Sequence, residues 1–188
     1  MSSRNLWISP VATGIIPVVT DQLTSRERRQ VERLGQGSRL VESIAVASLS
    51  LRKLRKDLPR GLLYRSYEEF FLKHGRLFTP RSFPSKYRKW RGKPKACLYN
   101  AVELALSFPK LDYVEGYALP AKGLPLPIPH SWCVDDEGKV VDPTWHKVVG
   151  LEYFGLAFDK GLLREQHPRV RGDNYTYPSA TITFTHRS

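Results

Sequence analysis

Residues 128–145 read IPHSWCVDDEGKVVDPTW and carry the strongest strand and turn signals in the chain. Its aromatic and β-branched residues predict one strand over Ile128–Val134 and a second over Lys139–Val141. The segment Asp135-Asp136-Glu137-Gly138 between them is typical of a tight turn. Because a tight turn can join only antiparallel strands, we expect an antiparallel hairpin here.

Outward from this hairpin, the pattern predicts one preceding helix and further strands. Residues Cys97 to Ser107 predict a helix, with Pro109 beyond its end. Tyr113 to Leu119 alternates and predicts a strand, and Thr181 to Thr185 predicts a last one. The predicted order places several helices first and then one helix that leads into antiparallel strands. This order is typical of an α+β arrangement. We therefore expect the helix that carries Cys97 to pack on an antiparallel sheet.

The N-terminal half is predicted to be helical. Two capping-box patterns, Thr24 with Glu27 and Ser66 with Glu69, each indicate the start of a helix. Residues 1–20 are interpreted as an extended arm and residues 79–95 as an irregular connection. The expected helices cover residues 25–34, about 39–56, and a segment after Ser66 that Gly75 closes. We divide the chain into a basic helical part, residues 1–91, and a core of residues 92–188, which together form one compact unit.

Length and composition point to a globular protein with one core. The chain has 188 residues, of which 41% are hydrophobic, with 4 Trp, 9 Tyr and 8 Phe. Two cysteines are too few for a disulfide scaffold or a zinc site built on cysteine alone. Met1 to Pro10 lacks the apolar run of a signal peptide, and no stretch is long enough for a membrane helix. We expect a cytoplasmic protein with no membrane contact.

The positive charge is concentrated in the middle of the chain. The formal net charge is +12, and the segment from Arg52 to Lys95 holds 15 Lys or Arg against 3 Asp or Glu. Aromatic residues such as Tyr87 and Trp90 lie among the basic ones. Such a mixture suits phosphate contacts and base stacking, so the segment is a candidate site for a polyanion or an acidic partner. The alternative is a solvated basic face that only keeps the protein soluble.

Three separated residues form a candidate site. Cys97 opens the predicted helix, where the helix dipole and nearby Lys93 and Lys95 favour a thiolate. His130 and Asp142 lie on the two strands of the hairpin, so they can come side by side. A carboxylate that orients an imidazole, which in turn ionises a thiol, is the minimal set for acyl transfer through a thioester. The backbone N–H of Cys97 is a candidate oxyanion donor.

Strand alternation separates the two cysteines. Residues 130, 132 and 134 share one face of their strand, and Cys133 lies on the other. If His130 faces the helix, Cys133 faces away from it and cannot be the nucleophile. We therefore interpret Cys133 as a small buried residue.

Four further side chains are candidates for substrate binding, each with an alternative. Tyr99 borders the pocket in this interpretation. Asn100 faces either the cleft or the loop before the helix. Trp132 either shields the His–Asp pair from water or only packs in the core. Glu115 is either a pocket carboxylate or an edge-strand charge.

The remaining histidines and the proline-rich loop before His130 each have a plain interpretation. His74, His146, His167 and His186 show no metal-ligand spacing, so we expect no metal and no cofactor. The loop 120–129 holds four prolines and leads into His130, so it forms either a stiff wall beside the cleft or an ordinary connection.

The three motifs resemble those of the transglutaminase-like branch of the papain-like cysteine enzymes. The matching positions are Cys97 at a helix start, His130 with Trp132, and Asp142 in Asp-Pro-Thr. Residues 113–117 and 153–155 also resemble those of small bacterial and phage proteins with this core. The resemblance covers about residues 92–160. It implies a papain-like core over 92–188 and peptide, isopeptide or amide hydrolysis or acyl transfer, with a protein or peptide-like amide as substrate.

The chain departs from the family pattern at two places. Ala96 stands where these enzymes usually carry a glycine before the cysteine. The second oxyanion donor has no clear match, with Tyr87 and Trp90 as candidates. The alternative function is a non-catalytic basic protein that binds nucleic acid or an acidic protein through residues 52–95, on a degenerate scaffold of the same kind.

Overall fold

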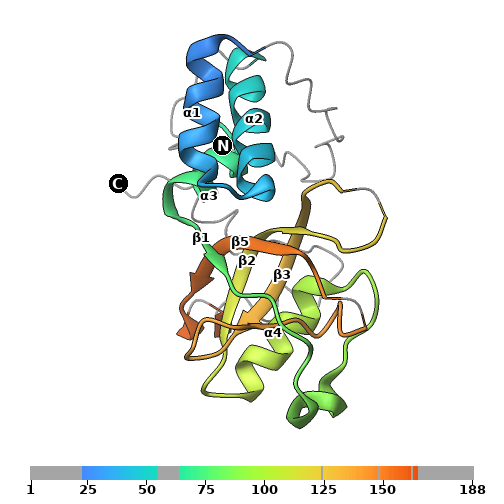
Figure 1. Ribbon diagram of the computed structural model, residues 1–188. Helices are drawn as coiled ribbons and strands as arrows, with labels where there is room; N and C mark the ends of the chain where they lie inside the picture. The colour runs from blue at the N-terminus through green and yellow to red at the C-terminus, as the bar shows by residue number, and fades with distance from the viewer. Residues whose placement is uncertain (1–22, 55–63, 124, 148, 162, 165–188) are drawn as a thin grey trace, which may run out of the picture.

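The computed structural model describes residues 23–54, 64–123, 125–147, 149–161 and 163–164, and Figure 1 shows their arrangement. They form an α+β structure, as the sequence predicts. In chain order the elements are α1 (Ser25–Gly35), α2 (Arg39–Leu54), α3 (Tyr67–His74), β1 (Arg76–Phe78), the 3-10 helix η3 (Ser85–Trp90), α4 (Cys97–Ser107), β2 (Asp112–Leu119), β3 (Ile128–Val134), β4 (Val140–Val141) and β5 (Glu152–Phe158).

The five strands form one antiparallel sheet in the order β1-β5-β2-β3-β4. The predicted strands at β2, β3 and β4 are confirmed, whereas β1 and β5 were not predicted. Thr79, just after β1, bridges Lys139, just before β4, so the sheet curls until its two edges meet. The predicted arm over 1–20 and the predicted strand over 181–185 lie outside the described residues.

Two glycines permit a close approach between β2 and β5. Gly116 pairs with Gly155 on one side and with His130 on the other. A Cβ atom at Gly116 would lie 2.1 Å from the carbonyl oxygen of Phe154, and one at Gly155 would lie 2.2 Å from that of Glu115. Only glycine fits such contacts with backbone atoms. The two cross-strand neighbours in line with His130, Gly116 and Gly155, therefore contribute only backbone atoms to this part of the sheet.

Side chains from the sheet form two separate cores. On one face, which we call the Cys133 face, α4 and parts of α2 and α3 pack against the strands. The opposite face, called here the Trp132 face, is smaller and collects a side chain from each strand. Its buried members are Phe78, Val114, Ala118, Trp132, Val134, Val140 and Tyr153. Residues that alternate along β3 therefore enter different cores.

The N-terminal helices begin where the capping patterns predict. In α1 the backbone N–H of Glu27 donates to Oγ1 of Thr24, and the Glu27 carboxylate accepts from the Thr24 N–H, which completes a capping box. In α3 the N–H of Glu69 donates to Oγ of Ser66, but the Glu69 carboxylate accepts from Arg65 N instead. Figure 1 shows α1 beside α2 at one end of the molecule, with α4 toward the other.

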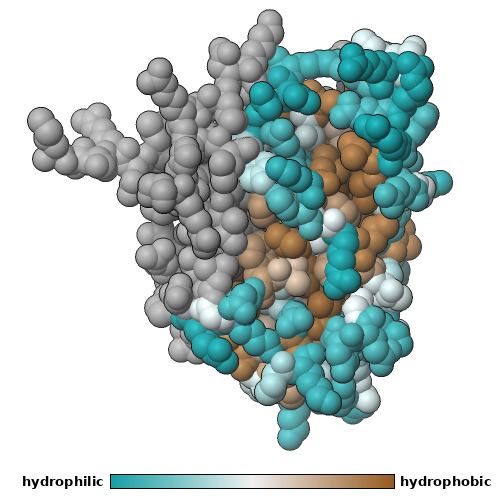
Figure 2. All heavy atoms as spheres, turned by 90° about the vertical axis from the view of Figure 1, so that its left-hand side faces the viewer, coloured by the Kyte–Doolittle hydropathy of each residue, from teal (hydrophilic) through white to brown (hydrophobic). Residues whose placement is uncertain are grey.

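The connection before α4 is more ordered than predicted, because η3 lies within it. Strand β1 and η3 both precede residue 92, and β1 pairs with β5 of the sheet. The sheet thus takes one strand from the part assigned to residues 1–91, and the division at residue 92 stays a prediction. Among the described helices, none has the length and apolar character needed to span a bilayer. A band of hydrophobic residues bordered by hydrophilic ones crosses the face shown in Figure 2.

Candidate functional site

The hairpin brings His130 and Asp142 together, as the sequence predicts. The ring nitrogen Nε2 of His130 lies 2.7 Å from Oδ2 of Asp142, and both side chains are almost completely buried. Strand β4 pairs with β3 only through Cys133–Val141 and Val134–Val140. Asp142, the next residue after β4, therefore falls on the face that carries His130.

Four hydrogen bonds hold the Asp142 carboxylate. Oδ1 accepts from the backbone N–H groups of Thr144 and Trp145, each at 2.9 Å. Oδ2 accepts from Nε2 of His130 and from the Tyr153 hydroxyl, the latter at 3.0 Å. The Tyr153 hydroxyl in turn accepts from the Gly150 N–H at 3.1 Å. A buried carboxylate with this set of donors is stable as an anion, and its position is fixed.

Two tryptophans fix the plane of the His130 ring. Trp145 stacks on it with a centroid distance of 4.2 Å and an interplanar angle of 19°. Trp132 lies 6.1 Å away at 20° and is itself fully buried. Aromatic contact on this scale restrains the ring and keeps water from the His–Asp pair. The position of Trp132 thus agrees with both interpretations, since it packs in the core and covers the pair.

Cys97 is the first residue of α4 and is partly buried. Its sulfur reaches His130 at an open edge of β3, because β4 covers β3 only at residues 133 and 134. The neighbouring His130 side chain stabilises the anionic form of the sulfur, and the backbone of Ser131 and of Leu98 adds to this effect. Since Asp142 holds Nε2, the ring nitrogen that remains for the sulfur is Nδ1.

The electrostatics of the three groups favour a charged pair. Burial raises the pKa of the Cys97 thiol, but the hydrogen bond and positive charge of His130 outweigh it, so the pKa lies below its usual value. Burial lowers the pKa of His130, but Asp142 and Cys97 raise it to about 9. Burial likewise raises the pKa of Asp142, and His130 brings it below its usual value. At neutral pH these directions favour a thiolate beside an imidazolium.

The chain enters α4 through a constrained turn. Lys95 has φ of +63°, a left-handed conformation that costs free energy for a residue with a side chain. Ala96 follows as the N-cap with φ −118° and ψ 40°, and no side chain caps the helix. The N-terminal N–H groups of α4 therefore remain open toward the sulfur. Ala96 stands where the family resemblance implies a glycine. The positive φ angle lies one residue earlier, at Lys95.

Asn100 ties the two halves of the site together. Its side-chain amide donates to the carbonyl oxygen of Lys93 at 2.8 Å and to Oγ1 of Thr144 at 2.9 Å. The Gly92 N–H donates to the carbonyl oxygen of Pro143 at 2.8 Å. A Cβ atom at Gly92 would lie 2.0 Å from Cγ of Asn100, so the glycine leaves room for this amide. Asn100 thus bonds the loop before the helix, as one of its two interpretations predicts.

Cys133 is buried, as predicted, but it faces α4, whereas the prediction had His130 on that side. Cys133 is fully buried, and its Sγ donates to the carbonyl oxygen of Ala101 in α4 at 3.2 Å. It therefore faces the helix, whereas His130 lies on the opposite face of the sheet. Cys97 still reaches His130 because it sits at the end of α4, beside the open edge of β3. Burial raises the pKa of Cys133 well above its usual value, which leaves it an inert thiol.

The other two predicted substrate residues lie in contrasting places. Tyr99 is 37% exposed, at the first turn of α4. Glu115 is 1% exposed and lies on the Cys133 face of β2, where its carboxylate accepts from the Tyr113 hydroxyl at 2.7 Å. The Tyr113 hydroxyl also lies 3.3 Å from Oγ of Ser131, next to His130 in the chain. A contact of Tyr99, Asn100, Trp132 or Glu115 with substrate stays a prediction.

The proposed second oxyanion donors lie away from the thiol. The rings of Tyr87 and Trp90 pack on Phe108, at centroid distances of 4.8 and 5.5 Å. Phe108 directly follows the last residue of α4, whereas Cys97 is its first. An 11-residue helix is about 16 Å long, which argues against either side chain as a donor beside the sulfur.

Sequence reasoning did not assign a site role to Trp145 or Tyr153. Trp145 directly follows the Asp-Pro-Thr motif and Tyr153 begins the segment 153–155, but their roles depend on the chain after β4 folding back over His130. Across the described segments, no cluster of three or more His, Cys, Asp or Glu side chains has the arrangement of a metal site. No family model, curated protein or solved structure matches this chain.

Proposed function

We propose that the chain carries out thiol-dependent acyl chemistry, with Cys97 as nucleophile, His130 as general acid and base, and Asp142 as the residue that orients His130. One observation supports this above all: Nε2 of the His130 ring is held 2.7 Å from a buried, fully hydrogen-bonded carboxylate, and the same imidazole lowers the pKa of the Cys97 thiol. The order Cys, His, Asp along the chain supports membership of the transglutaminase-like branch of papain-like enzymes.

The chemistry follows from the charges. The Cys97 thiolate attacks the carbonyl carbon of an amide, and a C–S bond forms. As the C–N bond breaks, the His130 imidazolium gives its proton to the departing amine. His130, now neutral, takes a proton from water or from an acceptor amine, which attacks the thioester and releases the thiolate. Water gives hydrolysis and an amine gives acyl transfer. The Cys97 N–H at the open helix start is the proposed oxyanion donor.

A protein or peptide-like amide is the proposed substrate, and the proposed location is the cytoplasm. Both cysteines are free. A reducing compartment preserves a nucleophilic thiol, which agrees with this location.

Selective alkylation tests the nucleophile. Iodoacetamide at neutral pH is expected to modify Cys97 well before Cys133, because one thiol is ionised by His130 and the other is buried at a raised pKa. Mass spectrometry of peptides from the intact chain and from Cys133→Ala measures the two rates. Cys97→Ala should abolish turnover of an amide substrate and leave thermal unfolding unchanged. Equal modification of both thiols in the folded chain would contradict the proposal.

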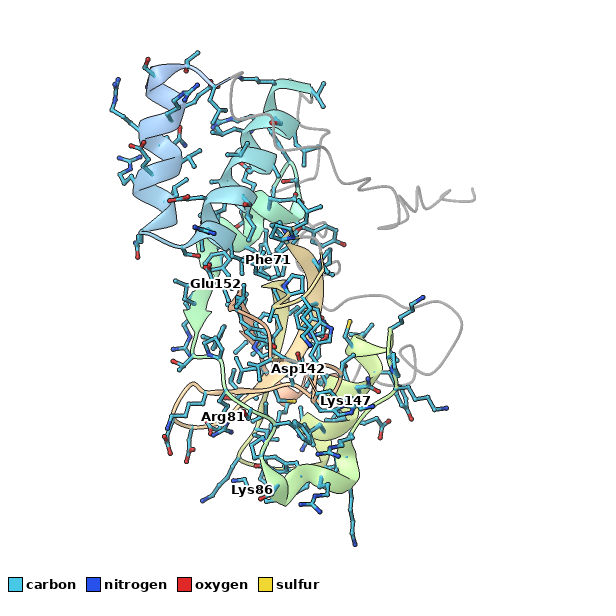
Figure 3. All side chains as sticks on the ribbon, turned by 45° about the vertical axis from the view of Figure 1, so that its right-hand side comes forward. Phe71, Arg81, Lys86, Asp142, Lys147 and Glu152 are labelled. Atoms are coloured by element: carbon cyan, nitrogen blue, oxygen red, sulfur yellow. The ribbon has the colours of Figure 1, made fainter. Side chains whose placement is uncertain are left out.

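A second candidate function is binding of a polyanion through η3. Lys86, Arg88 and Lys89 are exposed, and they line a hollow of about 330 Å³ with Ser85 and the partly exposed Trp90. Figure 3 places Lys86 at one end of the molecule, away from Asp142 in its middle. Basic side chains next to an exposed indole suit a phosphate backbone with stacked bases.

The two functions separate in one binding experiment. Single-stranded oligonucleotide binding should fall steeply with salt, survive Cys97→Ala, and weaken in the double variant Lys86→Glu/Arg88→Glu. Arg26→Glu/Arg29→Glu on α1 is the control, because it makes the same charge change at exposed residues elsewhere. Equal loss in both double variants would show attraction by net charge alone and remove this candidate.

A further inference from the structure

A pocket of about 660 Å³ lies beside the candidate site. Its lining residues are Pro94, Pro120, Ala121, Lys122, Leu126, Pro127, Ile128, Thr144, Trp145, His146 and Lys147. From its position and chemistry we infer that the pocket binds a peptide segment in which a Leu- or Phe-sized apolar side chain adjoins an acidic residue. This inference rests on the proposed function and names the substrate class of the same site.

The pocket lies beside the candidate site, and its lining residues Thr144 and Trp145 both donate backbone N–H groups to Asp142. Pro94 precedes Cys97 by three residues, and Ile128 precedes His130 by two. Trp145 lines the pocket and also stacks on His130, with the ring centroids 4.2 Å apart. An occupant that contacts Trp145 therefore lies close to His130. The pocket also supports the prediction of a stiff wall, because prolines of the 120–129 loop line it.

The walls are mainly apolar and the pocket is larger than one side chain. Proline, alanine, leucine, isoleucine and tryptophan supply most of the lining. Ile128 is 41% exposed although it begins a strand, so its side chain is open to an occupant. A volume of about 660 Å³ falls within the range of pockets that enclose drug-sized ligands. It can accept an apolar side chain together with a neighbouring residue.

The charge at the pocket selects the neighbouring residue. Lys122 and Lys147 are exposed lining residues, and no Asp or Glu belongs to the described lining. Figure 3 shows Lys147 on the same side of the molecule as Asp142. Two cations on an apolar pocket favour a carboxylate beside the apolar group and disfavour a basic residue there. Acidic peptides are thus preferred over neutral or basic ones of equal hydrophobicity.

Peptide binding to Cys97→Ala tests the pocket without turnover. Three fluorescein-labelled peptides that differ only at two adjacent residues, Leu-Glu, Gly-Glu and Leu-Lys, are titrated by anisotropy. The Leu-Glu peptide should bind at least about tenfold tighter than Gly-Glu, since one apolar group in a fitting pocket discriminates on this scale. It should bind about fivefold tighter than Leu-Lys at low salt, because exposed ion pairs are weak.

Variants of the pocket assign these preferences to its walls. Leu126→Ser should remove most of the preference for leucine, and Lys122→Glu/Lys147→Glu should reverse the preference for glutamate. Lys110→Glu is the control, because Lys110 is exposed beyond the opposite end of α4 from Cys97. Leu126→Ser and Lys122→Glu/Lys147→Glu should each keep the melting temperature of the parent. An unchanged melting temperature shows that a weaker affinity comes from a lost contact and not from unfolding.

The outcomes distinguish the pocket from the proposed chemistry. Fast alkylation of Cys97 together with equal binding of the three peptides, or no binding of any, would overturn the pocket inference alone. Preferences that survive Leu126→Ser and the lysine variants would also overturn it. Peptide preference with slow alkylation of Cys97 would support the pocket and contradict the chemistry. In the intact chain, the Leu-Glu peptide should slow iodoacetamide modification of Cys97 more than the other two.

Discussion

Trp145 lies flat against the His130 imidazole, with the two ring centroids 4.2 Å apart and an angle of 19° between the planes. The contact exists because the backbone N–H of Trp145 donates to Oδ1 of Asp142, while Oδ2 of the same carboxylate accepts from the imidazole. One aspartate thus positions both the ring and the indole that covers it. The site is therefore a folded unit built around Asp142.

Trp145→Ala should loosen this unit. Stacking of aromatic rings contributes on the order of 0.5–1.5 kcal/mol beyond burial, so the alkylation rate of Cys97 near neutral pH should fall about two- to tenfold. Trp145→Phe keeps a ring on the imidazole and should retain most of the rate. Alkylation stopped at set times and followed by mass spectrometry measures the Cys97 modification rate in both variants. A rate in the alanine variant equal to that of the parent would show that the indole does not position His130.

Asp142→Asn tests the electrostatic role of the carboxylate. The parent holds the pKa of His130 at about 9, so the ring stays charged up to that pH. Removal of the negative charge lowers the His130 pKa, the ring becomes neutral at lower pH, and the thiolate loses its partner. The pKa of Cys97 should then rise, and each unit of rise lowers the alkylation rate at acidic pH about tenfold.

The control for this change is Asp136→Asn, which alters an exposed carboxyl in the turn before β4. The measurement is the pH profile of the alkylation rate, and the midpoint should move up only in Asp142→Asn. A profile that stays in place in both variants would show that the imidazole does not need this carboxylate for its charge.

The left-handed backbone at Lys95 predicts a specific pattern of stability. Asn tolerates this conformation, whereas a β-branched residue does not. Lys95→Asn should therefore leave the free energy of unfolding nearly unchanged, and Lys95→Val should lower it by about 1 kcal/mol or more. Urea unfolding of the two variants makes the comparison at equal loss of charge. Equal stability of both would mean that the turn before α4 relaxes to an ordinary conformation.

Gly155 should tolerate no side chain. A Cβ atom there would lie 2.2 Å from the carbonyl oxygen of Glu115 and 2.9 Å from the Trp132 ring. Gly155→Ala is expected to cost about 1–3 kcal/mol, the usual range for overpacking. Gly161→Ala is the matched change, because a Cβ atom there meets mainly the movable carboxylate of Asp159. An equal fall in the melting temperature of both variants would contradict the close approach of β2 and β5.

Local signals explain what the sequence could predict. Cys97–Ser107 was predicted with its observed bounds, because an apolar helix pattern ends before a proline. The hairpin from β3 to β4 followed from its turn residues, and the pairing of His130 with Asp142 followed from the hairpin. Each of these predictions depends only on residues that are close together in the sequence.

Features that depend on distant contacts were not predicted. Strand β5 is buried on both of its faces, because Tyr153 enters the core of the Trp132 face and Phe154 that of the Cys133 face. Its sequence therefore lacks the alternation that marks a half-exposed strand. Strand β1 has only three residues. The roles of Trp145 and Tyr153 depend on the path of the chain after β4. His130 was expected on the sheet face that α4 covers, but it lies on the opposite face. Cys97 comes near it only because β4 is two residues long and leaves the edge of β3 open there.

The pKa of the Cys97 thiol shows whether His130 ionises the sulfur. Titration of the thiolate by its ultraviolet absorbance, in Cys133→Ala so that one thiol is observed, should give a pKa below the value of about 8.5 for a free cysteine. In the same protein with His130→Ala the pKa should return to that value or above it, since burial then acts without the imidazolium. A Cys97 pKa that is ordinary or raised in the parent, and unchanged by His130→Ala, would contradict the account.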